Sequence, residues 1–252
     1  MTDPGSQYVL LPERPSGPLS ARNLEDYREC PRRYLLSAFV TREQADAHVG
    51  GPAILSRAVR VALLAMYAAG GSGHLPLGEL ERVFQQNWDG KACRDSREEE
   101  DLRRDGLRMI AAHYASPLEL QGPPRVDVRL EAEIGGQAFV AVADLVDTGG
   151  SFAARFTTSR RPPSPGQLAQ ETSWTVLALL ARSVEGVASV RMVDLRGNRN
   201  LELALDASQE REAVEAICAT AARIDADRAF EPVTGKHCRW CRSRKDCPAW
   251  RR

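Results

Sequence analysis

Three cysteines near the C-terminus constrain this sequence more than any other feature. Cys238, Cys241 and Cys247 form a C-x2-C-x5-C array, with a proline directly after the last cysteine. Three thiolates at this spacing can bind one metal centre, but they leave a fourth coordination position open. We expect Cys30 to fill it, because Cys30 is also followed by proline, and such pairs are common among iron–sulfur ligands. This site would hold the two ends of the chain together.

The distribution of the cysteines also indicates which group they bind. A structural zinc site usually combines two short C-x2-C pairs, whereas this chain has one triplet and one distant cysteine. We therefore favour a 4Fe–4S cluster with a structural role and keep zinc as the alternative. Cys93 and Cys218 lie outside the array, and we expect Cys218 to be an ordinary buried thiol.

The balance of charge gives the whole protein no strong attraction to nucleic acids or membranes. The 252 residues contain 34 Lys and Arg and 34 Asp and Glu, so the formal net charge is zero. The N-terminus is polar and proline-rich, unlike a secretory signal. The longest apolar run, residues 59–69, contains Arg60 and is too short to span a bilayer. We therefore expect a cytoplasmic protein without a membrane partner.

Positive charge is nevertheless concentrated in places. Residues 235–252 contain seven Lys or Arg and one Asp, and Trp240 and Trp250 lie among them. A basic patch with aromatic side chains can contact phosphates and stack on bases. The same charges could equally belong to a merely solvated surface. The candidate nucleic-acid contacts in such clusters are Arg160, Arg161, Arg239, Arg242, Arg244 and Lys245.

The first half of the chain has the pattern of helices. Residues 1–18 are rich in proline and glycine, so we expect an extended arm there. Ser20 can cap a helix that ends near Cys30, and a second helical segment reaches Phe39. Apolar periodicity predicts further helices over about residues 53–69, 76–88 and 96–114, which form a helical insertion of about 40–120.

The pattern changes to strands after residue 123. Glycine pairs follow the first two strands, so we expect the first three strands to form an antiparallel meander. Strands are predicted over residues 126–134, 137–147, 151–157, 188–195 and 201–205, and helices over residues 166–182 and 208–227. We expect one domain over residues 19–252, with a core of about 124–230 and a cysteine tail of 235–252.

Three groups of residues together resemble a known family. They are residues 19–34 with the Cys30–Pro31 pair, residues 143–147 followed by Gln167 at the start of a helix, and the cysteine triplet. They resemble the iron–sulfur branch of the PD-(D/E)XK nuclease superfamily, which includes the RecB-type nuclease domain of AddB and CRISPR-associated exonucleases. The resemblance implies an α/β, restriction-endonuclease-like fold, in which helices flank a mixed central sheet. It also implies a cluster bound by Cys30, Cys238, Cys241 and Cys247.

The same resemblance implies that the active site is degenerate. In that family a His, two acidic residues and a Lys form a site that holds one or two Mg²⁺ ions. Asp144 matches the first acidic residue. Arg155 stands in place of the second, Thr157 in place of the Lys, and Arg60 in place of the His. A fixed guanidinium beside Asp144 repels Mg²⁺ and can pair with the carboxylate, which argues against magnesium binding.

Two alternatives stay open at this site. A catalytic residue could have moved to the following helix, where Glu171 is a candidate close to Gln167. Gln167 could also be no more than the first residue of that helix. Asp144, in turn, could simply accept hydrogen bonds or pair with Arg155.

Three functions are compatible with these residues. The first is a catalytically degenerate, nucleic-acid-binding or scaffolding subunit of a DNA-processing or defence complex. Arg60 and Arg155 would then hold the phosphates of DNA, most simply single-stranded DNA. The second is an active metal-dependent exonuclease with a rearranged site. The third is a protein–protein interaction module, for example in a helicase–nuclease complex, that binds no DNA.

Overall fold

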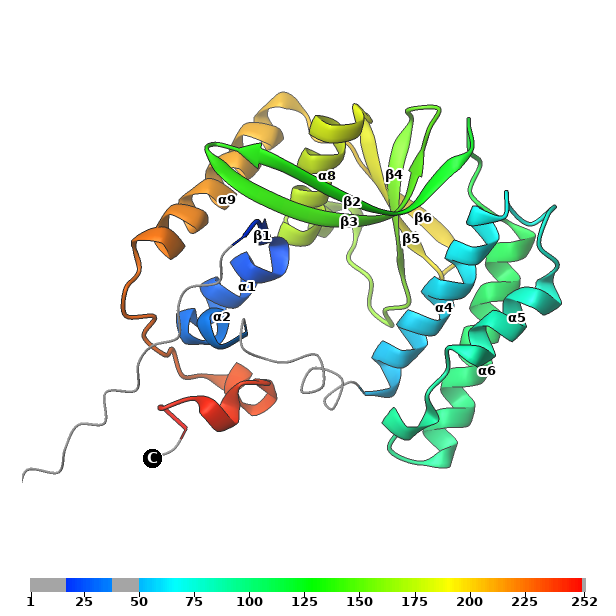
Figure 1. The fold of residues 1–252 in the computed structure, drawn as a ribbon, viewed down its shortest axis with the longest axis horizontal. Coiled ribbons are helices and arrows are strands. Elements are labelled where there is room, and N and C mark those ends of the chain that lie inside the picture. Colours follow the sequence, from blue (N-terminus) through cyan, green and yellow to red (C-terminus); the bar gives the residue numbers. More distant parts are fainter. Residues whose placement is uncertain (1–16, 38–49, 251–252) are drawn as a thin grey trace, which may run out of the picture.

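A mixed sheet of six strands forms the centre of the molecule (Figure 1). The computed structural model describes residues 17–37 and 50–250, so most of the predicted arm and Phe39 lie outside the described residues. The strands are β1 (Leu19–Ser20), β2 (Pro124–Ile134), β3 (Gln137–Asp147), β4 (Phe152–Thr157), β5 (Ser189–Asp194) and β6 (Arg199–Leu203). β3 is antiparallel to β2 and β4, β4 is parallel to β5, and β5 is antiparallel to β6. The predicted meander and the mixed α/β fold are confirmed.

Helices cover the sheet and form a separate group at one end of it (Figure 1). The described helices are α1 (Ala21–Glu29), α2 (Pro31–Ser37), α4 (Gly51–Ala68), α5 (Leu77–Gln86), α6 (Ser96–Ala115), α7 (Pro165–Leu168), α8 (Thr172–Glu185) and α9 (Ala207–Ala226). Short 3-10 turns are η1 (Gly90–Ala92), η2 (Lys236–Trp240) and η3 (Arg244–Asp246). The last two belong to the cysteine tail, which lies beside α2 (Figure 1).

The first helix begins and ends where the sequence predicts. The Ser20 hydroxyl accepts a hydrogen bond from the Asn23 backbone N–H at 3.3 Å, and the Asn23 side chain accepts one from the Ser20 N–H at 2.8 Å. This reciprocal cap satisfies two N–H groups that a helix start would otherwise leave unpaired. Cys30 ends the helix in an extended conformation, as expected for a residue before proline. The cysteine is thereby placed at the turn between α1 and α2.

Two hydrophobic clusters lie on the two faces of the sheet. The first joins α1, α8 and α9 to the sheet and contains the fully buried Leu24, Leu130, Phe139, Leu177, Val190 and Ile224. The second joins α4, α5 and α6 to the sheet and contains Leu55, Leu63, Phe84, Ile110, Phe152 and Val193. The helical insertion therefore shares a core with the sheet and has a fixed position against it.

The α4 helix is longer than the apolar run that predicts it. It spans 18 residues with a mean hydropathy of 1.2, which by length and composition alone would suffice to cross a membrane. Half of that stretch is buried inside the molecule, in contact with α5, α6 and the sheet. These contacts are those of a core helix, and they place Arg60 against β2 and β3.

The predicted helix over residues 166–182 is in fact two helices. After α7 the backbone tightens, because the N–H groups of Gln170 and Glu171 bond to the carbonyls three residues earlier. Glu171 then adopts an extended conformation and precedes the first residue of α8. The interruption lets α8 bury Trp174 and Leu177 beneath the sheet. Apolar periodicity does not reveal such a change of direction.

Strand β6 begins at Arg199, two residues before the predicted start. Asn198 has a positive φ of 46°, a conformation that asparagine tolerates well in tight turns. The turn therefore closes early, and Arg199 pairs directly with Asp194 of β5. An ion pair of 2.9 Å between their side chains reinforces the first position of the ladder.

Candidate functional site

Asp144 lies in β3 at the point where β3 and β4 separate. Only Leu145 and Val146 of β3 pair with β4, so the strands diverge next to Asp144. Its carboxylate is 4% exposed, and its Oδ2 accepts a hydrogen bond of 2.6 Å from the backbone N–H of Phe156 in β4. The Asp144 side chain thus supplies the acceptor for a β4 backbone N–H at a point where β3 no longer pairs with β4. Buried polar groups are normally paired in this way.

Arg60 of α4 bridges two carboxylates. Its Nε donates to Asp144, and its Nη2 donates to Asp127 Oδ1 at 2.6 Å. Asp127 is skipped in the pairing of β2 with β3 and has a φ of 52°. Pairing resumes at Val128 in the same register, so the ladder is interrupted at Asp127 without an inserted residue, and the Asp127 side chain reaches Arg60. The ion-pair partner of Asp144 is therefore Arg60, rather than Arg155 as the sequence allows.

The electrostatics of this bridge favour a permanent cation. Burial lowers the pKa of Arg60, but the neighbouring charge of Asp144 and the hydrogen bonds to Asp127 outweigh it, and the net pKa is raised. The guanidinium contacts Oδ1 of Asp144, so this oxygen already has a cationic partner. The Arg60 cation thus compensates the charge of both carboxylates.

A second guanidinium lies nearby. Arg155 is half-buried in β4, with its guanidinium carbon 5.6 Å from the centre of the Trp174 ring, a distance typical of a cation–π contact. Burial lowers the pKa of Arg155, Asp144 raises it and Arg60 lowers it further. Glu25 of α1 also lies close enough to raise this pKa. The buried carboxylate of Asp144 is therefore accompanied by two arginines.

The other predicted residues lie outside this hydrogen-bonded group. The Thr157 hydroxyl accepts a bond of 3.2 Å from the Ser159 N–H. The Gln167 side chain accepts one of 2.9 Å from the Ser164 N–H and so caps α7. Glu171 is exposed at the start of α8. Within the described ranges, the hydrogen bonds to Asp144 come from Arg60 and Phe156.

Sequence reasoning missed Asp127, Glu25 and Trp174 at this site. Asp127 occupies an ordinary polar position in an alternating strand, and an alternating pattern carries no sign of a local interruption in strand pairing. Burial is the main cause that raises the pKa of Glu25, and Glu171 adds to it. Glu25 therefore interacts electrostatically both with Glu171 at the start of α8 and with Arg155 in β4. These residues come together only through tertiary packing, which no local sequence pattern encodes.

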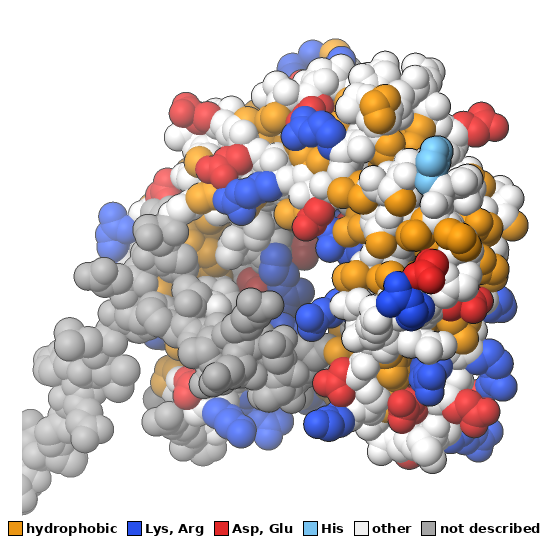
Figure 2. All heavy atoms as spheres, turned by 45° about the vertical axis from the view of Figure 1, so that its right-hand side comes forward, with side chains coloured by type: hydrophobic (Ala, Val, Ile, Leu, Met, Phe, Trp, Pro, Cys, Tyr) orange, Lys and Arg blue, Asp and Glu red, His pale blue; other side chains and the backbone are white. Residues whose placement is uncertain are grey.

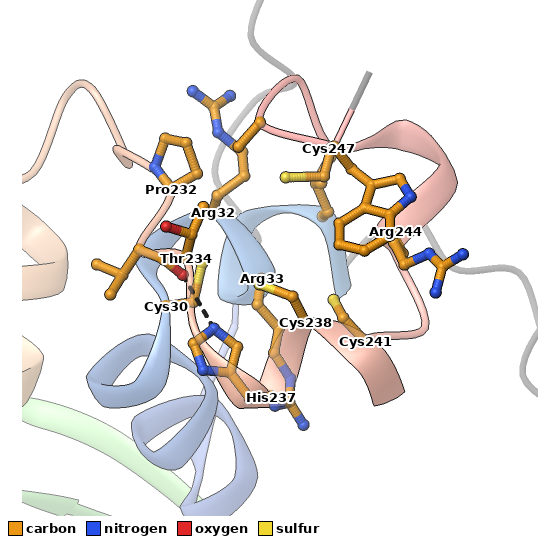
Figure 3. Close-up of a pocket in the computed structure, with 14 residues that line it drawn as sticks. Cys30, Arg32, Arg33, Pro232, Thr234, His237, Cys238, Cys241, Arg244 and Cys247 are labelled. Carbon is orange, nitrogen blue, oxygen red and sulfur yellow. Dashed lines mark hydrogen bonds between the residues drawn. The ribbon is translucent and has the colours of Figure 1, made fainter. Parts of the chain in front are cut away.

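The four predicted cysteines line one pocket between α2 and the tail (Figure 3). Cys30 is 6% exposed, and Cys238, Cys241 and Cys247 are half-buried. Burial raises the pKa of the Cys241 thiol, and the charges of Cys30 and Cys247 raise it further. The structure therefore brings Cys30, at the turn between α1 and α2, into one pocket with the three cysteines of the tail.

Direct protein contacts also hold this junction. The Tyr27 hydroxyl donates to Asp227 at 2.9 Å, and Tyr34 stacks on Phe230 with ring centres 6.0 Å apart. An Arg32 nitrogen donates to the Ala229 carbonyl at 3.2 Å. The segment after α9 is thus fixed against α1 and α2 before the tail begins.

The donor set at this pocket fits a metal centre in its chemistry. Four cysteine thiolates are the ligands of a 4Fe–4S cluster and also of a structural zinc ion. The Gly235 backbone N–H points at Cys238 Sγ, 3.4 Å away, as hydrogen bonds to ligating sulfurs do. Across residues 17–37 and 50–250, no three His, Cys, Asp or Glu side chains are close enough together to hold a metal ion. The four thiols share a pocket without converging on one point.

The basic residues form two separate surfaces. Arg160 lines an open depression of about 780 Å³ between α4, α6 and the loop after β4, and Arg161 follows it, exposed. Figure 2 shows the surface hollowed in its middle, with Lys and Arg side chains at the margin. The second surface is in the tail and is lined by Arg239, Trp240, Cys241, Arg242, Arg244 and Lys245.

A mixed sheet flanked by helices, with a buried aspartate where two central strands diverge, defines a nuclease-type α/β domain. The sequence matches the PD-(D/E)XK nuclease superfamily over residues 18–248, and the chain belongs to this superfamily. No curated protein matches the sequence significantly.

Solved structures resemble the chain at low sequence identity. A candidate exonuclease from Eubacterium rectale has a TM-score of 0.55 and 12% sequence identity, over 89% of this chain and 87% of that one. The protein SSO0001 has a TM-score of 0.41 and 16% identity, over 94% of this chain and 88% of that one. The first likeness supports the fold assignment.

Proposed function

We propose that this chain is a catalytically inactive member of its superfamily that binds DNA as a subunit of a DNA-processing or defence complex. The observation that carries the proposal is the Arg60 guanidinium, which binds Asp144 and Asp127 together. Hydrolysis in this superfamily depends on metal ions that orient a water molecule and stabilise charge on the phosphate. A protein cation at that point supplies positive charge but no metal-bound water.

The distribution of charge decides which residues would hold the phosphates. The positive charge of Arg60 is already used by two carboxylates, so this arginine is a weak phosphate ligand. Arg155, which has no carboxylate in direct contact among the described residues, and the exposed Arg160 and Arg161 are better placed. Single-stranded DNA is the expected ligand, because stacking and backbone contacts suffice for it without base readout.

A 4Fe–4S cluster in the cysteine pocket is part of the same proposal, with zinc as the alternative. Cys30, Cys238, Cys241 and Cys247 would hold it, and the group would supply a covalent connection between the turn after α1 and the tail. Its role would be structural. The charge balance and the core position of α4 agree with a cytoplasmic location.

The decisive experiment for the inactive site is a cleavage assay. Purified protein should not degrade single- or double-stranded DNA with Mg²⁺ or Mn²⁺. Cleavage that disappears in the D144A variant would contradict the proposal. Cleavage that disappears in E171A as well would instead establish a rearranged active site.

The binding proposal is tested by anisotropy with labelled single-stranded DNA. Binding should weaken steeply with salt, because each phosphate contact releases a counterion. The double variant R160A/R161A should bind more weakly and show a shallower salt slope. R82A is the matched control, because Arg82 is exposed on α5 and already paired with Glu79. No binding at low salt would favour a protein–protein module.

The cluster is tested by anaerobic purification followed by absorption spectroscopy and iron and sulfide analysis. A brown protein with about four iron atoms per chain is expected, as Cys₄ ligation of a 4Fe–4S centre requires. C30S should lose iron, whereas C218S should retain it, because Cys218 lies outside the pocket. One zinc ion per chain without iron would contradict the 4Fe–4S cluster and favour the zinc alternative.

A further inference from the structure

Trp240 is the most exposed large hydrophobic residue in the described part of the chain. Its exposed fraction is 85%, compared with 46% for Trp250. Large aromatic side chains usually bury most of their surface, so an indole open to solvent on a well-defined element indicates a contact surface. The residue ends η2 and directly precedes Cys241.

The backbone on both sides of Trp240 is anchored. Cys241 and Cys238 line the cysteine pocket, and the Cys241 N–H bonds to the Cys238 carbonyl in the 3-10 turn. Ser243, just beyond, is only 4% exposed. The indole therefore projects from a short turn that is fixed at both ends, which limits the entropy lost when a ligand stacks on it.

Positive charge surrounds the ring. Arg239, Arg242, Arg244 and Lys245 line the surface around Trp240. A neighbouring depression of about 280 Å³ adds Arg22 and Arg33 to the lining.

The one carboxylate that lines the neighbouring depression is neutralised. Asp26 is bound by Arg22 at 2.9 Å and by Arg33 at 2.8 Å. The surface beside the indole therefore has an excess of positive charge and suits an anionic ligand.

Trp250 does not offer the same open face. The Arg244 guanidinium lies 4.1 Å from the centre of a Trp250 ring, so one face of that indole already has a cation–π partner. The two tail tryptophans therefore differ, and Trp240 is the one available for stacking.

We infer that Trp240 is a stacking platform for an unpaired base of single-stranded DNA, with Arg239 and Arg242 beside the flanking phosphates. The inference rests on the proposed DNA-binding function and adds a site outside the Asp144 region. A flat aromatic face with flanking cations matches the alternating bases and phosphates of a single strand. A duplex presents no free base face, so double-stranded DNA should not use this contact.

The test compares two strands with equal numbers of phosphates, a thymidine 12-mer and the same backbone with abasic sites. The wild-type protein should bind the thymidine strand more tightly in fluorescence anisotropy. W240L should lower affinity for the thymidine strand about 5- to 150-fold, the range expected for loss of one stacked base. Its affinity for the abasic strand should change little, and W240F should retain most of the preference.

R242A is the contrasting variant, because it removes a charge and not a ring. It should weaken binding of both strands by the same factor. W250L serves as the control for the second tail tryptophan and should keep the preference for the thymidine strand. Circular dichroism and thermal unfolding of each variant show whether a loss of binding comes from a lost contact or from unfolding. If W240L does not fold, W240F is compared with the wild type on the same two strands.

The outcomes distinguish this inference from the function on which it rests. Wild-type binding without any preference between the strands, or a preference that survives in W240L, would overturn the stacking role and leave DNA binding intact. No binding of either strand by the wild type would overturn both proposals. A protein that binds through Trp240 in the absence of DNA affinity would identify the surface as a protein-docking site.

Discussion

At the scale of single residues, a side-chain cation compensates the buried carboxylate of the candidate site. The buried Asp144 would be costly to ionise alone, because an isolated carboxylate loses its hydration. Arg60 supplies the counter-charge, and the Phe156 N–H supplies a hydrogen bond. The site is therefore satisfied within the protein.

The first prediction concerns this ion pair. R60M should lower the free energy of unfolding by about 2 kcal/mol, less than for a fully buried pair because Arg60 is a third exposed. R60M/D144N should recover part of that loss, since no buried charge remains. Urea unfolding in a double-mutant cycle measures the coupling.

The control for this cycle is R129A, which breaks an exposed pair with Glu131 on β2. Its effect should stay within about 0.5 kcal/mol. Strict additivity of R60M and D144N would show that the two side chains do not interact in solution.

A second prediction at this scale concerns His113, buried between α4 and α6. The Tyr67 hydroxyl accepts a hydrogen bond from the Leu118 N–H at 3.0 Å and forms a second hydrogen bond of 2.8 Å with His113 Nε2. Burial lowers the pKa of His113 from 6.5 to about 4. The folded protein therefore binds fewer protons than the unfolded chain between these values.

Stability attributable to His113 should be complete above pH 6.5 and fall as the pH drops toward 4, by about 1.4 kcal/mol per pH unit. Urea unfolding at pH 7.5 and 5.0 should show a smaller loss for H113N than for the wild type. H74Q, at an exposed position, should behave like the wild type. An equal loss in H113N and the wild type would exclude His113 as the cause.

At the scale of elements, local patterns explain most helices and strands. The Ser20 cap, the alternating strands β2 and β3, and the glycine turns could be predicted because each depends on a few neighbouring residues. The break between α7 and α8 could not be predicted, because it serves the burial of Trp174 under a distant sheet. The interrupted pairing at Asp127 could not be predicted either, because the partner of Asp127 is Arg60, which is far away in sequence.

The end of α8 provides a test of element-level reasoning. Gly186 follows the helix with a φ of 69°, a left-handed conformation that disfavours residues other than glycine. G186A should cost about 1 kcal/mol, although no atom lies within 4 Å of the added Cβ. Thermal unfolding measures it.

Gly78 in α5 is the matched control, because it is equally uncrowded but has no positive φ. G78A should stabilise the protein by about 0.5 to 1 kcal/mol. A stabilising G186A would indicate that α8 ends differently in solution.

At the scale of the whole molecule, the α1–α2 segment meets the cysteine tail, and this junction lies apart from the Asp144 region. The spacing of the cysteines could predict this junction because few folds satisfy a triplet and a distant fourth thiol. The chemistry around Asp144 could be predicted only in part. Arg60 and Arg155 could be named from the sequence as neighbours of Asp144, but which of them pairs with it depends on how α4 packs against β3.

The junction makes a prediction about cooperativity. If the cysteine pocket holds a metal centre, C30S should expose both the tail and the α1–α2 segment to limited proteolysis. C93S, outside the pocket, should leave the cleavage pattern unchanged. Mass spectrometry of the fragments identifies the cleavage sites in the tail and in the α1–α2 segment. Cleavage confined to the tail would indicate that contacts such as Tyr27 with Asp227 hold α1 and α2 alone.

The Arg60 bridge has a consequence for the protein in a changing environment. A side-chain cation cannot be removed by EDTA, exchanged for another metal or depleted when free magnesium falls. If the proposed DNA binding depends on the shape of this region, its affinity should therefore be the same with and without chelator. Binding that required a metal ion at this site would instead weaken.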